Sequence, residues 1–117
     1  MIHHVTLESS AELIPREVEF WEILGFSSVP APDGAGEGTV WLESDGTQIH
    51  LLRTEEPVVP PGAHPAVVIP AFEETFARLG EAGHPVEMRP SLWGEPRAKT
   101  SSPGGHLVEF MAAPPPS

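Results

Sequence analysis

The feature that most constrains this chain is a repeat within its own 117 residues. His4 and His64, each at the start of an apolar stretch, are 60 residues apart, and the segments 46–52 and 105–111 align at a spacing of 59. The glycines that close two amphipathic stretches are 58 residues apart. A nearly constant spacing at three landmarks indicates two copies of one supersecondary unit. We therefore expect two similar modules related by a pseudo-two-fold axis.

Each module is predicted to run as a strand, a helix and three further strands. Alternation of apolar and polar residues predicts the strands, and apolar residues at helical spacing predict the helices. The expected strands are 3–8, 39–43 and 47–53 in the first module and 64–69, 86–88, 97–101 and 106–111 in the second, with helices inside 9–26 and from 72 onward. The chain is thus expected to be a single α+β domain, with module one at about 1–54, a linker at about 55–63, module two at about 64–112 and a tail at 113–117.

Composition excludes several classes of protein. Without cysteine, a disulfide scaffold, a zinc finger and thiol catalysis are excluded, and a reducing cytoplasm is the expected location. No apolar run reaches the roughly 18 residues of a membrane span, so no membrane partner is expected. The net charge of −11 repels phosphate backbones, which argues against a nucleic-acid partner and is compatible with a cationic ligand.

Four nitrogen and oxygen donors occupy equivalent places in the two copies. His4 and His64 stand at the first strands, and His50 and Glu109 stand in the last strands. In each strand the donor alternates with apolar neighbours, so the donors share one face while the apolar residues pack beneath the helices. A lone strand histidine is usually just a polar surface residue, but four donors at repeat-equivalent places favour one metal site.

Three segments resemble the vicinal oxygen chelate superfamily, which includes glyoxalases, bleomycin-resistance proteins and extradiol dioxygenases. They are Phe20-Trp21-Glu22-Ile23-Leu24-Gly25-Phe26, Gly83-His84-Pro85-Val86, and Trp93-Gly94 together with Ser102-Pro103-Gly104-Gly105-His106-Leu107-Val108-Glu109. Two departures are Ser102, where the superfamily usually has Asp, and His106, where it often has Asn.

The resemblance implies that two βαβββ modules form one cupped mixed sheet, with the helices on its convex side. It also implies that His4, His50, His64 and Glu109 hold one divalent transition metal, whether nickel, cobalt, zinc, iron or manganese. Such a metal would bind adjacent oxygens of a small substrate, as in a glyoxalase-like lyase or isomerase. A ring-cleaving dioxygenase would need only His4, His64 and Glu109. Glu109 and Glu8 are then the candidate catalytic proton carriers.

Further polar and aromatic residues are candidates for binding the substrate: Thr6, Trp41, Trp93, Arg97 and Lys99. Each has a simpler interpretation. Glu8 also fits a solvated rim, the two tryptophans also fit core or rim packing, and the two cations also fit a balancing of nearby acids. His84, in a Gly-His-Pro turn, and His106, at the start of a strand, are both expected to be exposed.

A different class of function stays open at this point. A metal-free protein of the bleomycin-resistance type would sequester a cationic antibiotic in an aromatic groove, and the negative charge and the tryptophans suit it. The set of four donors argues against this function, because a protein that only sequesters an antibiotic does not need metal ligands. Under either interpretation the edge strands of the modules and the resemblance indicate a homodimer.

Overall fold

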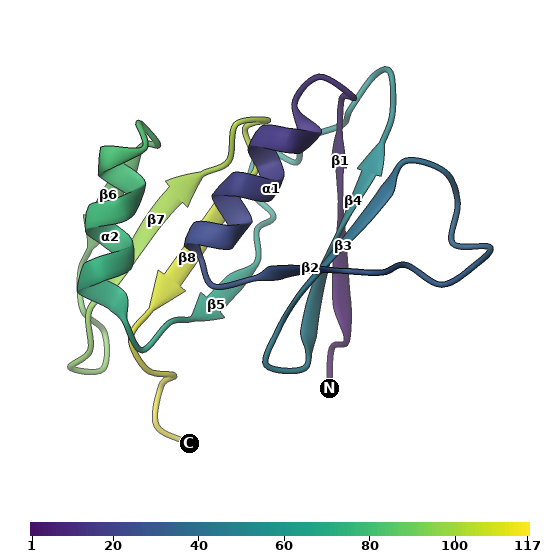
Figure 1. Cartoon of the computed structure of the whole chain (residues 1–117). Coiled ribbons are helices and arrows are strands. Elements are labelled where there is room, and N and C mark those ends of the chain that lie inside the picture. The colour runs from purple at the N-terminus through teal and green to yellow at the C-terminus, as the bar shows by residue number, and fades with distance from the viewer. The chain divides into compact units, whose positions relative to one another are not determined.

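A computed structural model describes residues 1–117, and its contacts divide the chain into two compact units, Met1–Val59 and Pro60–Ser117. Each unit holds one helix and four strands in the order β-α-β-β-β (Figure 1). In each unit the four strands form one mixed sheet. The predicted α+β fold made of two βαβββ modules is therefore confirmed.

The first unit contains β1 (His4–Ser9), α1 (Ile14–Ile23), β2 (Ser27–Val29), β3 (Thr39–Ser44) and β4 (Thr47–Arg53). The strands lie in the order β1-β4-β3-β2, with β1 parallel to β4 and the other pairs antiparallel. Asp45 and Gly46 join β3 to β4 with φ angles of 49° and 84°. Two successive positive φ values are typical of the tight hairpin turn that suits twisted strands.

The second unit contains β5 (Ala66–Val68), α2 (Phe72–Glu81), β6 (Val86–Arg89), β7 (Arg97–Ser101) and β8 (Leu107–Met111). The order β5-β8-β7-β6 repeats that of the first unit, again with one parallel pair, β5 with β8. Both helices are ten residues long, and neither is long and apolar enough to cross a membrane.

Both helices end in the same hydrogen-bonded turn. After α1, Phe26 N–H donates to the Trp21 carbonyl (3.0 Å) and Gly25 N–H donates to that of Glu22 (3.0 Å). Gly83 and the residue after it repeat both bonds after α2. This is the Schellman motif, which places a left-handed residue just after the helix, and Gly25 has a φ of 95°. The two glycines identified in the sequence repeat therefore end the two helices in the same way.

The structure corrects three sequence predictions. The strand expected over 64–69 is only Ala66–Val68, because Pro65 has no N–H and contributes only its carbonyl, which accepts from Glu109 N–H at 3.0 Å. His64 therefore lies two residues before β5 instead of opening it. Strand β2 was not among the strands located by residue, since Ser27–Val29 is short and mostly exposed.

The face of each sheet that carries the apolar residues follows from strand alternation. In the second unit Phe110 is fully buried, and its ring lies 5.0 Å from that of Phe72, so α2 covers the Phe110 face of β8. Register places Met88 and Ala98 on the same face. Glu109, the next residue along β8, therefore points to the opposite face.

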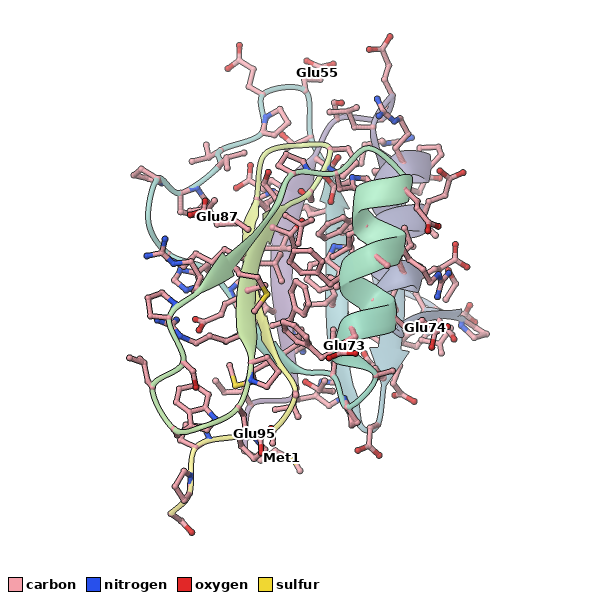
Figure 2. The ribbon with its side chains drawn as sticks, turned by 90° about the vertical axis from the view of Figure 1, so that its left-hand side faces the viewer. Met1, Glu55, Glu73, Glu74, Glu87 and Glu95 are labelled. Carbon is pink, nitrogen blue, oxygen red and sulfur yellow. The ribbon has the colours of Figure 1, made fainter.

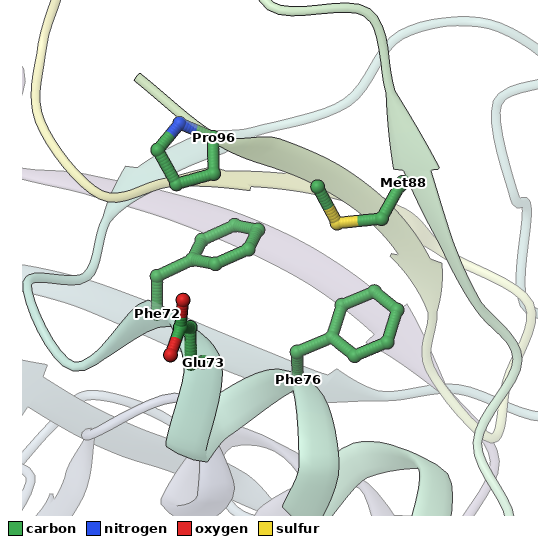
Figure 3. Close-up of a pocket in the computed structure, with 5 residues that line it drawn as sticks. All are labelled: Phe72, Glu73, Phe76, Met88 and Pro96. Atoms are coloured by element: carbon green, nitrogen blue, oxygen red, sulfur yellow. The ribbon is translucent and has the colours of Figure 1, made fainter.

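A small pocket opens on this helix-covered face of the second unit. It is lined by Phe72, Glu73, Phe76, Met88 and Pro96 (Figure 3) and holds about 190 Å³. Because Met88 shares the face of Phe110, the pocket lies on the side of the sheet away from Glu109. It is therefore separate from the face that carries the predicted metal ligands of this unit.

Candidate functional site

The register of the parallel strand pairs brings the predicted ligands of each unit together. In the first unit Thr6 pairs with His50, and His4 lies two residues before Thr6. In the second unit Ala66 pairs with Glu109, and His64 lies two residues before Ala66. The two halves therefore present their candidate ligands at the same register positions, which supports the sequence alignment of the repeat.

His50 is held between two aromatic rings. Its imidazole stacks on Trp41, with ring centroids 4.0 Å apart and planes 5° apart. His4 stacks with His50 at 4.0 Å and 14°. The His50 side chain is buried, with 5% of the residue exposed. Burial lowers the pKa of His50, and the neighbouring His4 and His3 lower it further. The imidazole is therefore kept in the neutral form that a metal ligand needs.

A chain of hydrogen bonds ends on His50. His50 Nε2 lies 2.7 Å from Gln48 Oε1, and Gln48 Nε2 donates to Glu43 Oε1 at 2.9 Å. An amide oxygen accepts only, so His50 Nε2 must carry a proton in this arrangement. The nitrogen left for a ligand is Nδ1. His4 is exposed, and its Nδ1 lies 3.0 Å from Nδ1 of His3.

In the second unit, Glu109 lies between His64 and Arg97. Arg97 donates to Glu109 Oε1 at 2.8 Å, and His64 Nε2 lies 3.5 Å from Glu109 Oε2. Arg97 also donates to the Pro90 carbonyl at 2.7 Å, so its guanidinium is anchored at two points. Burial alone would raise the pKa of Glu109, but hydrogen bonds and charge from Arg97 and His64 hold it below its usual range. Glu109 is thus ionised at neutral pH.

The contacts of His64 set its ring for ligation. His64 Nδ1 lies 2.8 Å from the Gly62 carbonyl, so Nδ1 donates. Nε2 faces Glu109 Oε2 and either carries a second proton that the carboxylate accepts, which gives an ion pair, or presents a lone pair. In the second case two acceptors face each other and need a cation between them. This matches the common pattern in which a ligating histidine donates its other N–H to a carbonyl.

The spacing of this pair also fits a metal ion. Ligand bonds of about 2.0–2.2 Å to one ion, at tetrahedral or octahedral angles, put neighbouring ligand atoms about 3.0–3.5 Å apart. The His64 to Glu109 separation of 3.5 Å is at the upper end of that range. Neither unit by itself brings three or more candidate ligands together around one point. Each unit holds one pair of candidate ligands.

The predicted substrate-binding and catalytic residues lie in different surroundings. Thr6 is exposed on the His50 face, and Glu8 Oε1 accepts from Val58 N–H at 3.2 Å. Trp93 Nε1 donates to the Ala113 carbonyl at 3.0 Å and so ties down the start of the tail. Lys99 is partly exposed and pairs in register with Glu109.

Two further candidates, Trp41 and Arg97, contact candidate ligands. Trp41 supports His50 by stacking. Arg97 binds Glu109 and the Pro90 carbonyl. Each therefore supports a candidate ligand directly.

Sequence reasoning missed the residues that orient the candidate ligands. Gln48 was detectable, because it lies two residues before His50 and alternation puts both on one face. The position of Glu43 was also detectable, because a two-residue hairpin turn at 45–46 places Glu43 opposite Gln48. The Gly62 carbonyl left no sequence signal.

The two histidines expected to be exposed lie in more enclosed places. His106 is buried, with 3% exposed, and its N–H donates to Ser102 Oγ at 3.1 Å. Ser102, in the place of the usual Asp, therefore still closes the turn before β8. His84 is partly buried.

Acidic side chains are exposed on both units. Figure 2 shows Glu55, Glu73, Glu74, Glu87 and Glu95 projecting outward as sticks, and all five are exposed. They account for part of the net charge of −11. A cation would approach this surface with favourable long-range electrostatics.

Comparison with solved structures identifies the fold. A protein of Bacillus anthracis named for the glyoxalase family superposes with a TM-score of 0.84 at 24% identity, over 95% of this chain and 93% of that one. The fosfomycin resistance protein FosX of Listeria monocytogenes gives 0.76 at 18% identity, over 97% and 91%. The chain has the vicinal oxygen chelate fold. The structural part of the sequence resemblance is thereby confirmed.

Other proteins with the vicinal oxygen chelate fold bear different functional names. TnmS3, an antibiotic binding protein of Streptomyces sp. CB03234, gives a TM-score of 0.72 at 20% identity, over 100% of this chain and 96% of that one. No protein-family model and no curated protein matches the chain. Because a glyoxalase family protein, a fosfomycin resistance protein and an antibiotic binding protein share this fold, the choice of function depends on the site.

Proposed function

We propose that the protein is a divalent-metal-dependent enzyme, a glyoxalase-like lyase or isomerase acting on a small substrate with adjacent oxygens. The observation that carries this proposal is the His64–Glu109 pair, whose tautomer, charge and spacing suit a cation. The equivalent register of His4 and His50 supplies a second pair. We propose that the two units form one domain in which both pairs hold the same ion, of nickel, cobalt, zinc, iron or manganese.

The residues around the proposed metal site have separate proposed roles in catalysis and substrate binding. When bound, the metal would polarise the two substrate oxygens and so stabilise negative charge that develops beside them. Arg97 holds Glu109 Oε1 and leaves Oε2 directed at His64. Glu8 shares the β1 face of His4 and is our candidate for moving a proton, with Glu109 as the second candidate. Thr6, Lys99 and Trp93 remain proposed contacts for the substrate.

Calorimetric titration of the metal-free protein with Ni²⁺ or Zn²⁺ tests this proposal. We expect saturable binding by the wild type and strongly weakened binding by His4→Ala and by Glu109→Gln. Glu87→Gln is the matched control, because register places Glu87 beside Lys99 on the Glu109 face but no candidate ligand contacts it. Absence of saturable binding, or equal binding by wild type and both ligand variants, would contradict the metalloenzyme proposal.

The second candidate is a metal-free protein that sequesters a cationic antibiotic. Two observations favour it: the net charge of −11, and the occupation of His50 Nε2 by Gln48. Titration with metal-free bleomycin in the presence of a chelator separates the candidates. Tight binding without metal, together with no saturable metal binding, would favour sequestration. We further propose a homodimer, to be tested by sedimentation velocity, and a cytoplasmic location stays a prediction from the cysteine-free sequence.

A further inference from the structure

The side chains of Glu43, Gln48 and His50 form a hydrogen-bonded chain with only one possible direction. An ionised carboxylate only accepts hydrogen bonds, so the end of Gln48 that lies 2.9 Å from Glu43 is its NH₂ group. The Gln48 oxygen must then face the ring nitrogen 2.7 Å away, which is His50 Nε2. The charge of Glu43 therefore determines, through Gln48, which His50 nitrogen carries the proton.

The surroundings keep this chain in place. The β3–β4 hairpin sets Glu43 directly opposite Gln48, and Trp41 directly opposite His50. Gln48 and His50 are both buried, with 8% and 5% exposed. Trp41 and His4 stack on the two faces of the imidazole, so the ring is held in one orientation. The other tautomer would leave the buried Gln48 oxygen facing a bare nitrogen lone pair, which is unfavourable.

The second unit lacks this arrangement. Register places Leu107 where the first unit has Gln48, and Ser101 where it has Glu43. His64 is instead oriented by the Gly62 carbonyl, which accepts a hydrogen bond from its Nδ1–H. The two histidines are therefore set in opposite tautomers by unrelated contacts.

We infer that Glu43 and Gln48 are positioning residues that lock His50 as the Nε2–H tautomer, so that His50 binds its ligand through Nδ1 whereas His64 binds through Nε2. The ligation part rests on the proposed function, but the tautomer does not. A carboxylate behind the N–H also makes the opposite nitrogen a better electron donor. Gln48 passes that effect from Glu43 to His50 without placing a charge against the ring.

The tautomer can be read directly in the metal-free protein by long-range ¹H–¹⁵N NMR at pH 8, where the ring is neutral. In wild type we expect His50 to be protonated at Nε2. In Glu43→Gln the amide at position 48 is no longer held in one direction, so the Nδ1–H form should become measurable. The double variant Glu43→Gln/Gln48→Glu reverses the roles of the two side chains while keeping the charge, and it should restore the Nε2–H form.

Metal affinity gives the second readout. Gln48→Leu should weaken Ni²⁺ binding about 10- to 100-fold, the usual effect of losing a residue that orients a ligand. The double variant should bind within a few-fold of wild type, and circular dichroism of each variant checks folding. A wild-type His50 protonated at Nδ1, or a tautomer unchanged in Glu43→Gln, would overturn the inference. An Nε2–H tautomer without any metal binding would refute the proposed function and leave the positioning role intact.

Discussion

The two ion pairs of the second sheet should differ sharply in strength, although both join an arginine to a glutamate. Arg97 and Glu109 each expose only 14% of their side chains and are 2.8 Å apart. Arg89 and Glu87 expose 39% and 75% and are 3.3 Å apart. We predict that the coupling free energy of the Arg97–Glu109 pair exceeds that of the Arg89–Glu87 pair several-fold.

The magnitudes follow from exposure and geometry. A hydrogen bond to a charged group that is largely shielded from water contributes about 1.5–3 kcal/mol to stability. An exposed pair of the same residue types contributes about 0.2–1 kcal/mol, because water screens the charges and the side chains lose freedom. Arg97 also donates to the Pro90 carbonyl, so its guanidinium is already oriented before it meets Glu109. We therefore expect a value in the upper part of the first range.

Double-mutant cycles measured by urea unfolding in the presence of a chelator test this prediction. One cycle uses Arg97→Met with Glu109→Gln, and the matched cycle uses Arg89→Met with Glu87→Gln. Because the folded-state pKa of Glu109 is lowered, its stabilising contribution is present above its usual value of 4.5 and is lost as the pH falls through the folded value. The destabilisation caused by Arg97→Met should therefore shrink in acid. Equal coupling energies in both cycles would refute the reasoning.

Three further predictions follow from the fold and the donor set. Gly25→Ala should cost about 1–2 kcal/mol in urea unfolding, since a side chain at a φ of 95° is strained, while Gly62→Ala should be nearly neutral. Phe110→Ala should cost about 3–5 kcal/mol because the side chain is fully buried, against under about 1.5 kcal/mol for Met88→Ala, which is half exposed. Metal affinity measured calorimetrically should fall in acid because ligand histidines must be neutral, and His50 should protonate only below the usual histidine value of 6.5 because burial lowers its pKa; a flat profile would contradict histidine ligation.

The repeat was the part of the fold most fully predictable from the sequence. Helix ends at Gly25 and Gly83 and the hairpin at 45–46 were visible because each requires a residue that tolerates positive φ. The predicted start of β5 was wrong, because the effect of Pro65 on pairing depends on which strand lies beside it. Strand β2 has three residues with no alternation of its own, and its pairing with β3 defines it.

The sequence predicted the strand positions of the candidate ligands but not their contacts. Alternation places His50 and Glu109 on faces opposite the apolar residues, and the register agrees. The partners of Glu109 and His64 depend on contacts across strands and loops, where single-sequence reasoning has no signal. Arg97 was predicted either to hold a substrate anion or to balance nearby acids, and in the structure it donates to Glu109. A cation near a predicted carboxylate ligand is ambiguous until the strand register is known.

The parallel pairing of β1 with β4, and of β5 with β8, has a consequence for how such chains can vary in length. Inserting one residue inside β1 would turn His4 to the opposite face and bring Val5 and Leu7 out of the core. Adding residues to the segments 30–38 or 54–63 would change neither strand register. Insertions and deletions among proteins with this fold should therefore occur mainly in those two segments. In such chains a candidate ligand should stay an even number of residues from the other residues on its face of the strand. The number of residues between the two modules can change without moving a ligand to the other face.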